Sequence, residues 1–420
     1  MKVFRILLSY GSCGLLIFLI FLGCGKKQDD FITLNWWQFW TNPEVKPTIL
    51  ELIERFEKEN PNIKVNLTDL TWSDGHEKIV VAFGSGTAPD VLELGSDWVP
   101  EFSYQDVLLD VTFEAEKIKK EFLMWEPATI GNPTDASPKI FGFPWILDTR
   151  VLFYNKDLMK KAGLNPENPP KTWDELLEYC EAVNRLKPDA YGFGANSAER
   201  HRLYKKFLPF LWANGGRILS EDPREPEINS SEGVQALEFY KKLTQNGMID
   251  TQAMLDEAFK HNKIGFVISG GWLLNDLRKN YPELNFGICL MPKPESDRGT
   301  SASFAGGEFL VINRKTKNPF EALELIKFLI QKDNCLKVCQ AIGSGFPSAK
   351  GVSSDPYYME NPDLLVFQEQ LKFAISPPPH PKWVYIEESI EKAVEEVMYD
   401  KKSPQDALDE AKSEIDKLLR

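Results

Sequence analysis

The fold follows from the stretch between residues 31 and 94, which opens with FITLNWW (31–37) and closes with DVLEL (90–94). Both segments are short and rich in aliphatic and aromatic residues, so they predict buried strands. Three further elements are expected between them: a helix from Pro47 to Asn60, a strand over 63–67 and a helix over 78–83. Alternating strands and helices are typical of a doubly wound sheet, which offers a ligand crevice at the carboxyl ends of its parallel strands.

A second region of alternating helices and strands begins near Phe153. Thr172 and Glu175 form a capping box that predicts a helix running to about Leu186. Further helices are expected over 231–246 and 319–330, from Trp383 and from Ser403, and strands over 264–268, 286–290 and 308–312. A chain of 420 residues exceeds what one hydrophobic core supports, so we expect two α/β lobes.

Composition excludes several classes of function. The chain is 43% hydrophobic and 26% charged, which is typical of a globular protein. Its 49 basic and 62 acidic residues give a net charge of −13 and no basic run, so nucleic-acid binding is not expected.

The N-terminus resembles an export signal. Lys2 and Arg5 precede an uncharged apolar run that extends to Gly23, and Cys24 follows directly. This junction resembles the lipobox of bacterial lipoproteins, in which the cysteine carries the lipid, although bulky residues stand at positions 21 and 22. We therefore expect a signal peptide over 1–23, lipidation of Cys24 and a tether over 24–31, with an uncleaved membrane anchor as the alternative. Either way the body of the protein lies outside the cytoplasm.

Metal and cofactor chemistry have no support in the sequence. Four cysteines remain after position 24, and Cys335 and Cys339 share a helical face, but the four histidines are scattered. Buried thiols are therefore expected, without a metal site. The sequence contains no GxxxxGK[ST], HExxH or GxSxG motif, and residues 192–194 lack the third glycine of a dinucleotide fingerprint. We expect no cofactor and no catalytic residues.

Tryptophan placement points to a ligand. Of eleven tryptophans, several follow predicted strands or open a helix: Trp36, Trp37, Trp40, Trp98, Trp272 and Trp383. An indole face complements the CH-lined face of a pyranose, and neighbouring carboxylates or amides bind ring hydroxyls. Trp272 is the strongest candidate, because the preceding Gly270 and Gly271 allow close backbone approach, whereas Trp125, Trp145 and Trp173 are expected in the core.

Five segments, in order along the chain, resemble one family. These are SGTAPDV (85–91), LFYNKDL (152–158), TWDE (172–175), ISGGW (268–272) and FAGG (304–307), with NPFEA (318–322) after them. They resemble the extracellular solute-binding proteins of bacterial ABC importers, in the sugar-binding group that includes maltose-binding protein. The likeness covers nearly the whole chain after the tether. Leu94 and Trp98 depart from maltose-binding protein, so a maltodextrin is not specifically expected.

The resemblance implies a fold and a set of site residues. The fold would be two αβα lobes joined by a multi-crossing hinge, with one lobe at 32–147 plus 308–346 and the other at 148–307 plus 347–420. Crossings are expected near residues 146–150, 305–309 and 345–348. The substrate-binding residues carried over are Trp37, Gln38, Trp40, Ser96, Asp97, Asp148, Trp272, Gly307 and Trp383.

The expected function is that of a lipid-anchored, monomeric sugar receptor on the outer side of the cell membrane. A mono- or oligosaccharide would bridge the two lobes, and the closed form would dock on a membrane permease that a separate ATPase drives. Two alternatives remain. One is an exported hydrolase that uses Asp97 or Asp148 as an acid, and the other is a receptor for a non-sugar solute such as a glycerol phosphodiester or a peptide.

Overall fold

The computed structural model describes residues 31–130, 138–197, 199–222, 224–295, 299–352 and 354–420. The predicted lipidation site Cys24, the signal peptide and all of the tether except its last residue lie outside this part of the chain. Among the described residues, no helix combines the length and apolar character needed to cross a bilayer.

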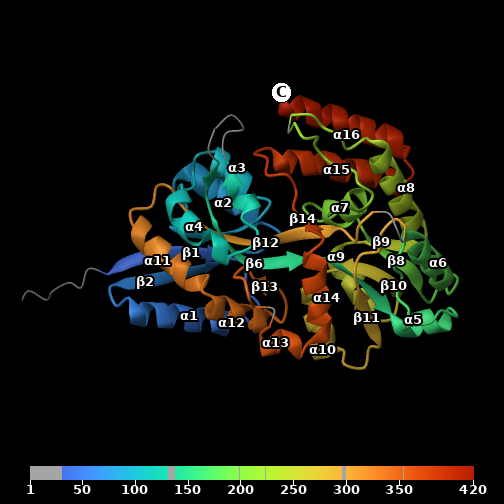
Figure 1. Ribbon diagram of the computed structural model, residues 1–420, viewed down its shortest axis with the longest axis horizontal. Coiled ribbons are helices and arrows are strands. Elements are labelled where there is room, and N and C mark those ends of the chain that lie inside the picture. The colour runs from blue at the N-terminus through green and yellow to red at the C-terminus, as the bar shows by residue number, and fades with distance from the viewer. Residues whose placement is uncertain (1–30, 131–137, 198, 223, 296–298, 353) are drawn as a thin grey trace, which may run out of the picture.

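Two large sheets organise the molecule, one in each half of the view in Figure 1. The first has seven strands, with the order β13-β6-β12-β3-β1-β2 and with β14 beside β12. Its strands are β1 (Ile32–Gln38), β2 (Ile63–Asp69), β3 (Val91–Gly95), β6 (Phe143–Thr149), β12 (Ser303–Ile312), β13 (Phe346–Pro347) and β14 (Ala374–Ile375). The second sheet has the order β11-β7-β10-β8-β9. Its strands are β7 (Val151–Asn155), β8 (Tyr191–Asn196), β9 (Gly247–Asp250), β10 (Ile264–Ser269) and β11 (Phe286–Cys289). A small separate sheet pairs β4 (Thr129–Ile130) with β5 (Lys139–Ile140).

The parallel arrangement predicted for the N-terminal strands is confirmed, because β1 pairs in parallel with both β2 and β3. Four strands from later in the chain, β6, β12, β13 and β14, complete this sheet, and among them β12 runs antiparallel to both β3 and β6. The strand expected over 308–312 begins five residues earlier, at Ser303, because the additional residues pair with β14 and with β6.

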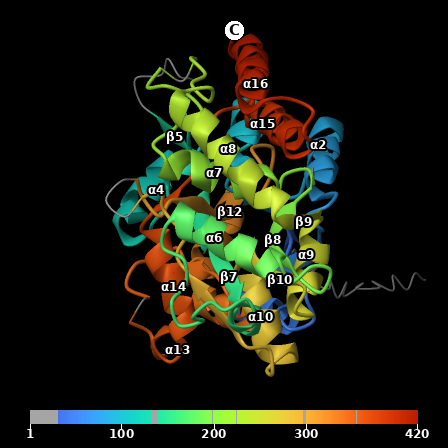
Figure 2. The same cartoon turned by 90° about the vertical axis from the view of Figure 1, so that its right-hand side faces the viewer.

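Helices cover both sheets (Figures 1 and 2). In the first lobe they are α1 (Lys46–Glu59), α2 (Gly75–Ser85), α3 (Val99–Tyr104), α4 (Thr112–Ile118), α11 (Pro319–Leu329) and α12 (Lys332–Ile342), with the 3-10 turns η1 (Lys119–Glu121) and η2 (Glu126–Ala128). In the second they are α5 (Lys156–Lys161), α6 (Trp173–Asn184), α7 (Tyr204–Ala213), α8 (Ser231–Gln245), α9 (Gln252–Lys260), α10 (Gly271–Asn280), α15 (Trp383–Met398) and α16 (Pro404–Leu419). Two more, α13 (Pro356–Met359) and α14 (Pro362–Leu371), pack together.

Local signals in the sequence set several helix starts. The predicted capping box is confirmed: the Thr172 side chain accepts from the Glu175 backbone N–H, and the Glu175 side chain accepts from the Thr172 backbone N–H. Ser403 caps α16 by accepting from the backbone N–H of Asp406. These bonds satisfy amide groups that would otherwise lack partners in the first helical turn.

Strand β7 of the second sheet is buried on both faces. Val151 and Phe153 belong to the core that continues from the first sheet, whereas Leu152 and Tyr154 point into a separate core. Helices α6, α7, α8, α15 and α16 build that separate core. Burial on both faces explains why this strand is apolar at every position except its last.

Buried tryptophans and cysteines complete the cores. Trp125, Trp145 and Trp173 are buried, as expected, and Cys335 and Cys339 are buried free thiols on α12. The expectation for Trp36 is wrong: its ring is fully buried and packs edge-on against Trp145 at 6.0 Å, so it does not line a crevice. It faces into the sheet's core because side chains alternate along a strand.

The chain passes between the two sheets more than once. It leaves the first sheet after Thr149 and enters the second at Val151, then returns between Cys289 and Ser303. After β14 it leaves the first sheet for the last time, and α15 and α16 pack on α7 and α8 of the second lobe. The residue limits that we gave for the two lobes stay a prediction.

Candidate functional site

The site begins at the carboxyl ends of β1, β2 and β3, which lie at one edge of the first sheet because these strands are parallel. Gln38 ends β1 and donates from Nε2 to Asp69 Oδ1 at the end of β2, at 2.6 Å. Its Oε1 accepts from the backbone N–H of Trp40. Gln38 is fully buried, and both ends of its amide are therefore engaged in holding this edge together.

Asp97 joins the two lobes directly. It follows β3, and its Oδ2 accepts from the Tyr204 hydroxyl at 2.6 Å and lies 3.2 Å from Lys205 Nζ. Both partners belong to α7 of the second lobe. Burial alone would raise the pKa of Asp97, but the Lys205 ammonium and the Tyr204 hydroxyl outweigh it, and the pKa is lowered. We call Asp97, Tyr204 and Lys205 the interlobe latch.

Trp272 forms the second part of the site, at the start of α10. Its ring is 36% exposed, and Nε1 donates to Asp256 Oδ2 at 2.9 Å. The Arg150 guanidinium lies over the ring, 4.6 Å from its centroid, and also donates to Asp148. An aromatic face, a carboxylate and a guanidinium therefore meet at one place, next to the passage from β6 to β7.

Lys206 lies beneath this group. It is almost fully buried, donates from Nζ to the Ile268 carbonyl at 2.7 Å, and lies 5.9 Å from the Trp272 centroid. Burial and the nearby Arg150 lower the pKa of Lys206, while burial raises the pKa of Asp256 despite its hydrogen bond from Trp272. The buried surroundings of Lys206 and Asp256 therefore favour the neutral form of each side chain over its charged form.

The middle of β12 contacts the segment that carries Asp97. The backbone N–H of Ser96 donates to the Gly307 carbonyl at 2.9 Å, and a Cβ at Gly307 would lie 2.2 Å from the Ile146 carbonyl. Only glycine fits so close to the neighbouring strand. Next to it, Glu308 is buried beside Asp148 and Arg150, and burial raises its pKa well above the ordinary range.

The other predicted aromatic residues differ in exposure. Trp37 and Trp40 are half-buried against the first core, near Gln38. Trp383 is fully buried, with its ring 5.5 Å from Tyr204, and it borders a small hollow with Ser96, Asp97 and the loop over 376–379. Its ring supports Tyr204 and has no exposed surface.

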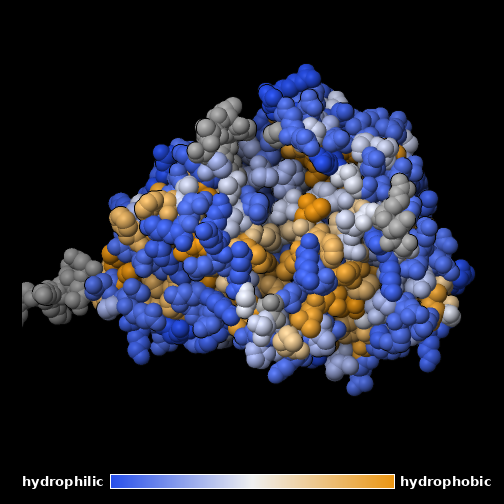
Figure 3. Space-filling model, in the orientation of Figure 1, coloured by the Kyte–Doolittle hydropathy of each residue, from blue (hydrophilic) through white to orange (hydrophobic). Residues whose placement is uncertain are grey.

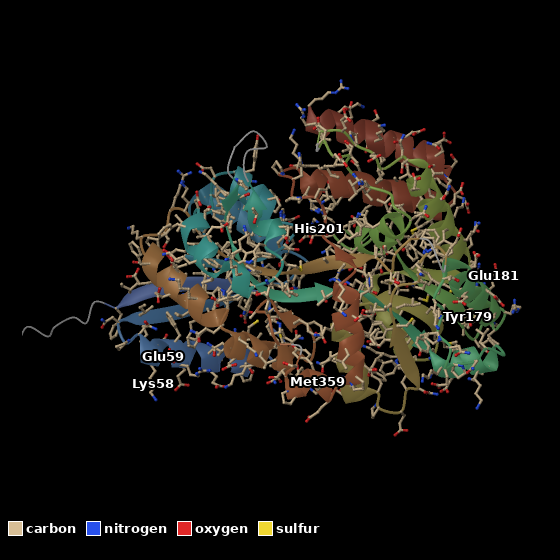
Figure 4. The ribbon with its side chains drawn as sticks, viewed as in Figure 1. Lys58, Glu59, Tyr179, Glu181, His201 and Met359 are labelled. Carbon is tan, nitrogen blue, oxygen red and sulfur yellow. The ribbon has the colours of Figure 1, made fainter. Side chains whose placement is uncertain are left out.

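Two histidines face each other across the lobes. His76 of α2 and His201, on the loop before α7, have ring centroids 5.9 Å apart, and Trp98 lies against both. Figure 4 shows His201 near the middle of the molecule, on the side facing the first lobe. His201 binds Glu387, and burial lowers its pKa to about 4, so its ring is neutral at physiological pH. The space-filling view in Figure 3 is indented along its upper edge where the two halves meet.

The structure thus brings Ser96, Asp97 and Gly307 together, and Asp148 and Trp272 together through Arg150. The partners in the second lobe, Tyr204, Lys205 and Asp256, were not predicted. No local pattern marks them, because Tyr204 lies 107 residues from Asp97 along the chain. Among the described residues, no group of three or more histidine, cysteine or carboxylate side chains is arranged to hold a metal ion.

A family model described as bacterial extracellular solute-binding protein matches residues 51–366. The chain belongs to this family. As a member of an extracellular family of solute-binding proteins, it is exported and binds a solute.

Curated relatives support the same placement. The solute-binding protein is 28% identical over 384 residues to a putative binding protein of Brucella abortus, with 89% of this chain and 90% of that protein covered. It is 27% identical to the galactooligosaccharide-binding protein of Bacillus subtilis, covering 89% and 86%. It is 26% identical to the sn-glycerol-3-phosphate-binding periplasmic protein of Shigella dysenteriae, covering 91% and 92%.

Solved structures share its fold. An ABC transporter solute-binding protein of Thermotoga lettingae, bound with alpha-D-tagatose, superposes with a TM-score of 0.81 at 26% identity, covering 93% of this chain and all of that one. The two-lobed architecture of the solute-binding protein is therefore that of a known class of receptors.

Proposed function

We propose that the protein captures a neutral carbohydrate between its two lobes and delivers it to the membrane permease of an ABC importer. The observation that carries this proposal is the environment of Trp272. Its exposed indole lies beside the Asp148–Arg150 pair, so a flat apolar face adjoins both an acceptor and a donor. This combination suits a pyranose, whose ring has an apolar face and hydroxyl groups at its edge.

Charge balance favours a neutral ligand. Arg150 pairs with Asp148 and Lys205 with Asp97, and the third basic side chain there, Lys206, is buried with a lowered pKa. A dianionic phosphate ester would need uncompensated positive charge. The galactooligosaccharide-binding relative and the tagatose complex support a sugar, while the sn-glycerol-3-phosphate-binding relative makes glycerol phosphates the alternative to test.

Hydrolysis finds little support in the geometry. A glycosidase acid needs a raised pKa, whereas the pKa of Asp97 is lowered and its carboxylate is occupied by Tyr204 and Lys205. Asp148 is held in an ion pair with Arg150. We therefore propose binding without turnover, which incubation with labelled oligosaccharides checks directly.

Calorimetric titration with a panel of sugars, and with glycerol 3-phosphate, tests the proposal. We expect saturable binding of a saccharide, weakened about tenfold or more by Trp272→Ala and weakened also by Asp148→Ala. Phe320→Ala is the matched control, because this aromatic residue is 79% exposed on α11, on the outside of the first lobe. Binding of glycerol 3-phosphate alone, or full sugar affinity in both cleft variants, would refute the sugar site.

We propose further that the mature protein is a monomer, anchored to the outer side of the cell membrane by a lipid on Cys24. The support is the sequence alone, in which Lys2 and Arg5 precede the apolar run and Cys24 follows Gly23. Mass spectrometry of the membrane-extracted protein should find a diacylglyceryl group on Cys24 and no residues before it. A chain that retains residues 1–23 would contradict this anchor.

A further inference from the structure

The two most exposed tryptophans of the described chain lie on opposite lobes. Trp72 is 38% exposed in the first lobe and Trp272 is 36% exposed in the second. The other indoles are half-buried or buried. Trp272 already has a place in the proposed sugar site, whereas nothing in the packing of the first lobe requires Trp72 to stand out into solvent.

Trp72 stands at the same sheet edge as the site. It lies in the loop between the end of β2 and the start of α2, and β2 ends alongside β1 and β3. A Cβ placed on Gly95 would lie 2.7 Å from Asp97 Oδ1 and 3.6 Å from Trp72 Cζ3. The indole and the carboxylate of the interlobe latch therefore border the same point.

The Trp72 ring is held rigidly from one side. It stacks on Phe39 with a centroid distance of 4.2 Å and an angle of 20°, and it touches Trp98 at 5.4 Å. The Phe39 backbone N–H donates to Glu93 at 2.8 Å, which anchors the supporting ring. A planar side chain that is fixed on one face and open on the other loses little conformational entropy when a ligand stacks on it.

Charged side chains lie between the two indoles, on either side of the Phe304 ring. Arg150 lies over Trp272, and Arg150 and Lys205 both lie over the Phe304 ring, at 5.7 Å and 5.0 Å from its centroid. Lys205 in turn reaches Asp97, which borders Trp72. Hydrogen-bonding groups therefore adjoin each exposed indole, Arg150 at Trp272 and Asp97 near Trp72.

We propose that Trp72 is a second stacking subsite for a sugar ring, so that the cleft takes a saccharide of at least two linked pyranoses. One ring lies against Trp272, and the next lies against Trp72. This inference rests on the proposed sugar-binding function and specifies the length of its ligand. Hydroxyl groups between the two rings would replace the contacts of the interlobe latch.

A matched ligand series tests the subsite. Affinities of the full mature protein are measured for galactose, a galactobiose and a galactotriose, and for glucose, maltose and maltotriose. Trp72→Ala should weaken the best disaccharide or trisaccharide about tenfold and leave the corresponding monosaccharide unchanged, whereas Trp72→Phe should retain most of the affinity. Trp272→Ala should weaken every ligand of that series.

A further variant, Trp72→Leu, guards against a folding defect. Trp72→Leu fills most of the space on Phe39 but has no flat face, so it should fold with a thermal midpoint close to that of Trp72→Phe and lose the affinity for the longer sugars. If Trp72→Ala and Trp72→Leu bind oligosaccharides as the wild type does, or if their monosaccharide and disaccharide affinities fall equally, the subsite is refuted while the sugar site stands. If the wild type binds no saccharide of either series, the proposed function itself fails, and the subsite fails with it.

Discussion

Removal of one hydroxyl group should loosen the closed arrangement of the lobes. In Tyr204→Phe the ring keeps its edge-on contacts with Trp383 and Phe304, at 5.5 Å and 5.9 Å, and only the donor to Asp97 is lost. A hydrogen bond to a charged group contributes about 1.5–3 kcal/mol net of its hydration. Since this bond exists only when the lobes touch, the ratio of closed to open protein should fall roughly 10- to 150-fold.

A distance measurement across the cleft detects this shift. Tyr104 on α3 and Tyr385 on α15 are 62% and 58% exposed and belong to opposite lobes, so cysteines at these positions accept spin labels. The native Cys180, Cys335 and Cys339 are buried, and protein without the engineered cysteines reports any background labelling. Electron resonance on the ligand-free protein should show one short distance in the wild-type background and a longer population in Tyr204→Phe.

Tyr399→Phe serves as the control for this experiment, because Tyr399 follows α15 at its C-terminal end and is 46% exposed. It should leave the distances unchanged. Identical distance distributions for Tyr204→Phe and the wild type would show that the hydroxyl does not hold the lobes together, and the latch would then be a passive contact.

Three further changes test the fold and its charges. Thr172→Ala removes the α6 cap and should lower the urea-unfolding free energy by about 1 kcal/mol, and a change below 0.3 kcal/mol would show that the cap is dispensable. Gly192→Ala should destabilise by more than about 2 kcal/mol, since its Cβ would lie 2.1 Å from the Cys180 carbonyl and 2.7 Å from that of Asn246; unchanged stability would mean that the backbone can move apart. Burial holds the pKa of His201 at about 4, below its ordinary 6.5, so the neutral ring contributes its full stability above pH 6.5 and loses it as the pH falls towards 4. The stability of the wild type relative to His201→Gln should therefore fall by about 1–2 kcal/mol between pH 7.5 and 5, and parallel pH profiles would exclude this linkage.

The parts of the fold that local sequence dictates could be predicted. The capping box at Thr172, the strands over 63–67 and 264–268, and the parallel order of the first three strands follow from patterns within short windows. The place of β12 could not be predicted in this way. Its register with β3 joins residues that lie more than two hundred positions apart, and no periodicity encodes that pairing.

The site shows the same limit. Trp272 was predicted from the two glycines before it, whereas Ser96, Asp97 and Asp148 were carried over from the family resemblance; all four lie at the junction of the lobes. Their partners on α7 and α9 carry no local mark. Trp36 and Trp37 show a second limit. Side chains alternate along a strand, so Trp36 enters the core whereas its neighbour Trp37 is only half-buried. Two adjacent tryptophans do not by themselves indicate which of them faces the core.

The position of β12 late in the sequence has a consequence for how the chain is synthesised and exported. This strand lies between β3 and β6, so the first sheet cannot close until residue 312 has been synthesised. Until then β3 presents an unpaired edge, and loop closure over such a separation is slow. A polypeptide whose first sheet stays incomplete through about three quarters of its synthesis is easier to keep extended, and an extended chain is what passage through a narrow membrane pore requires.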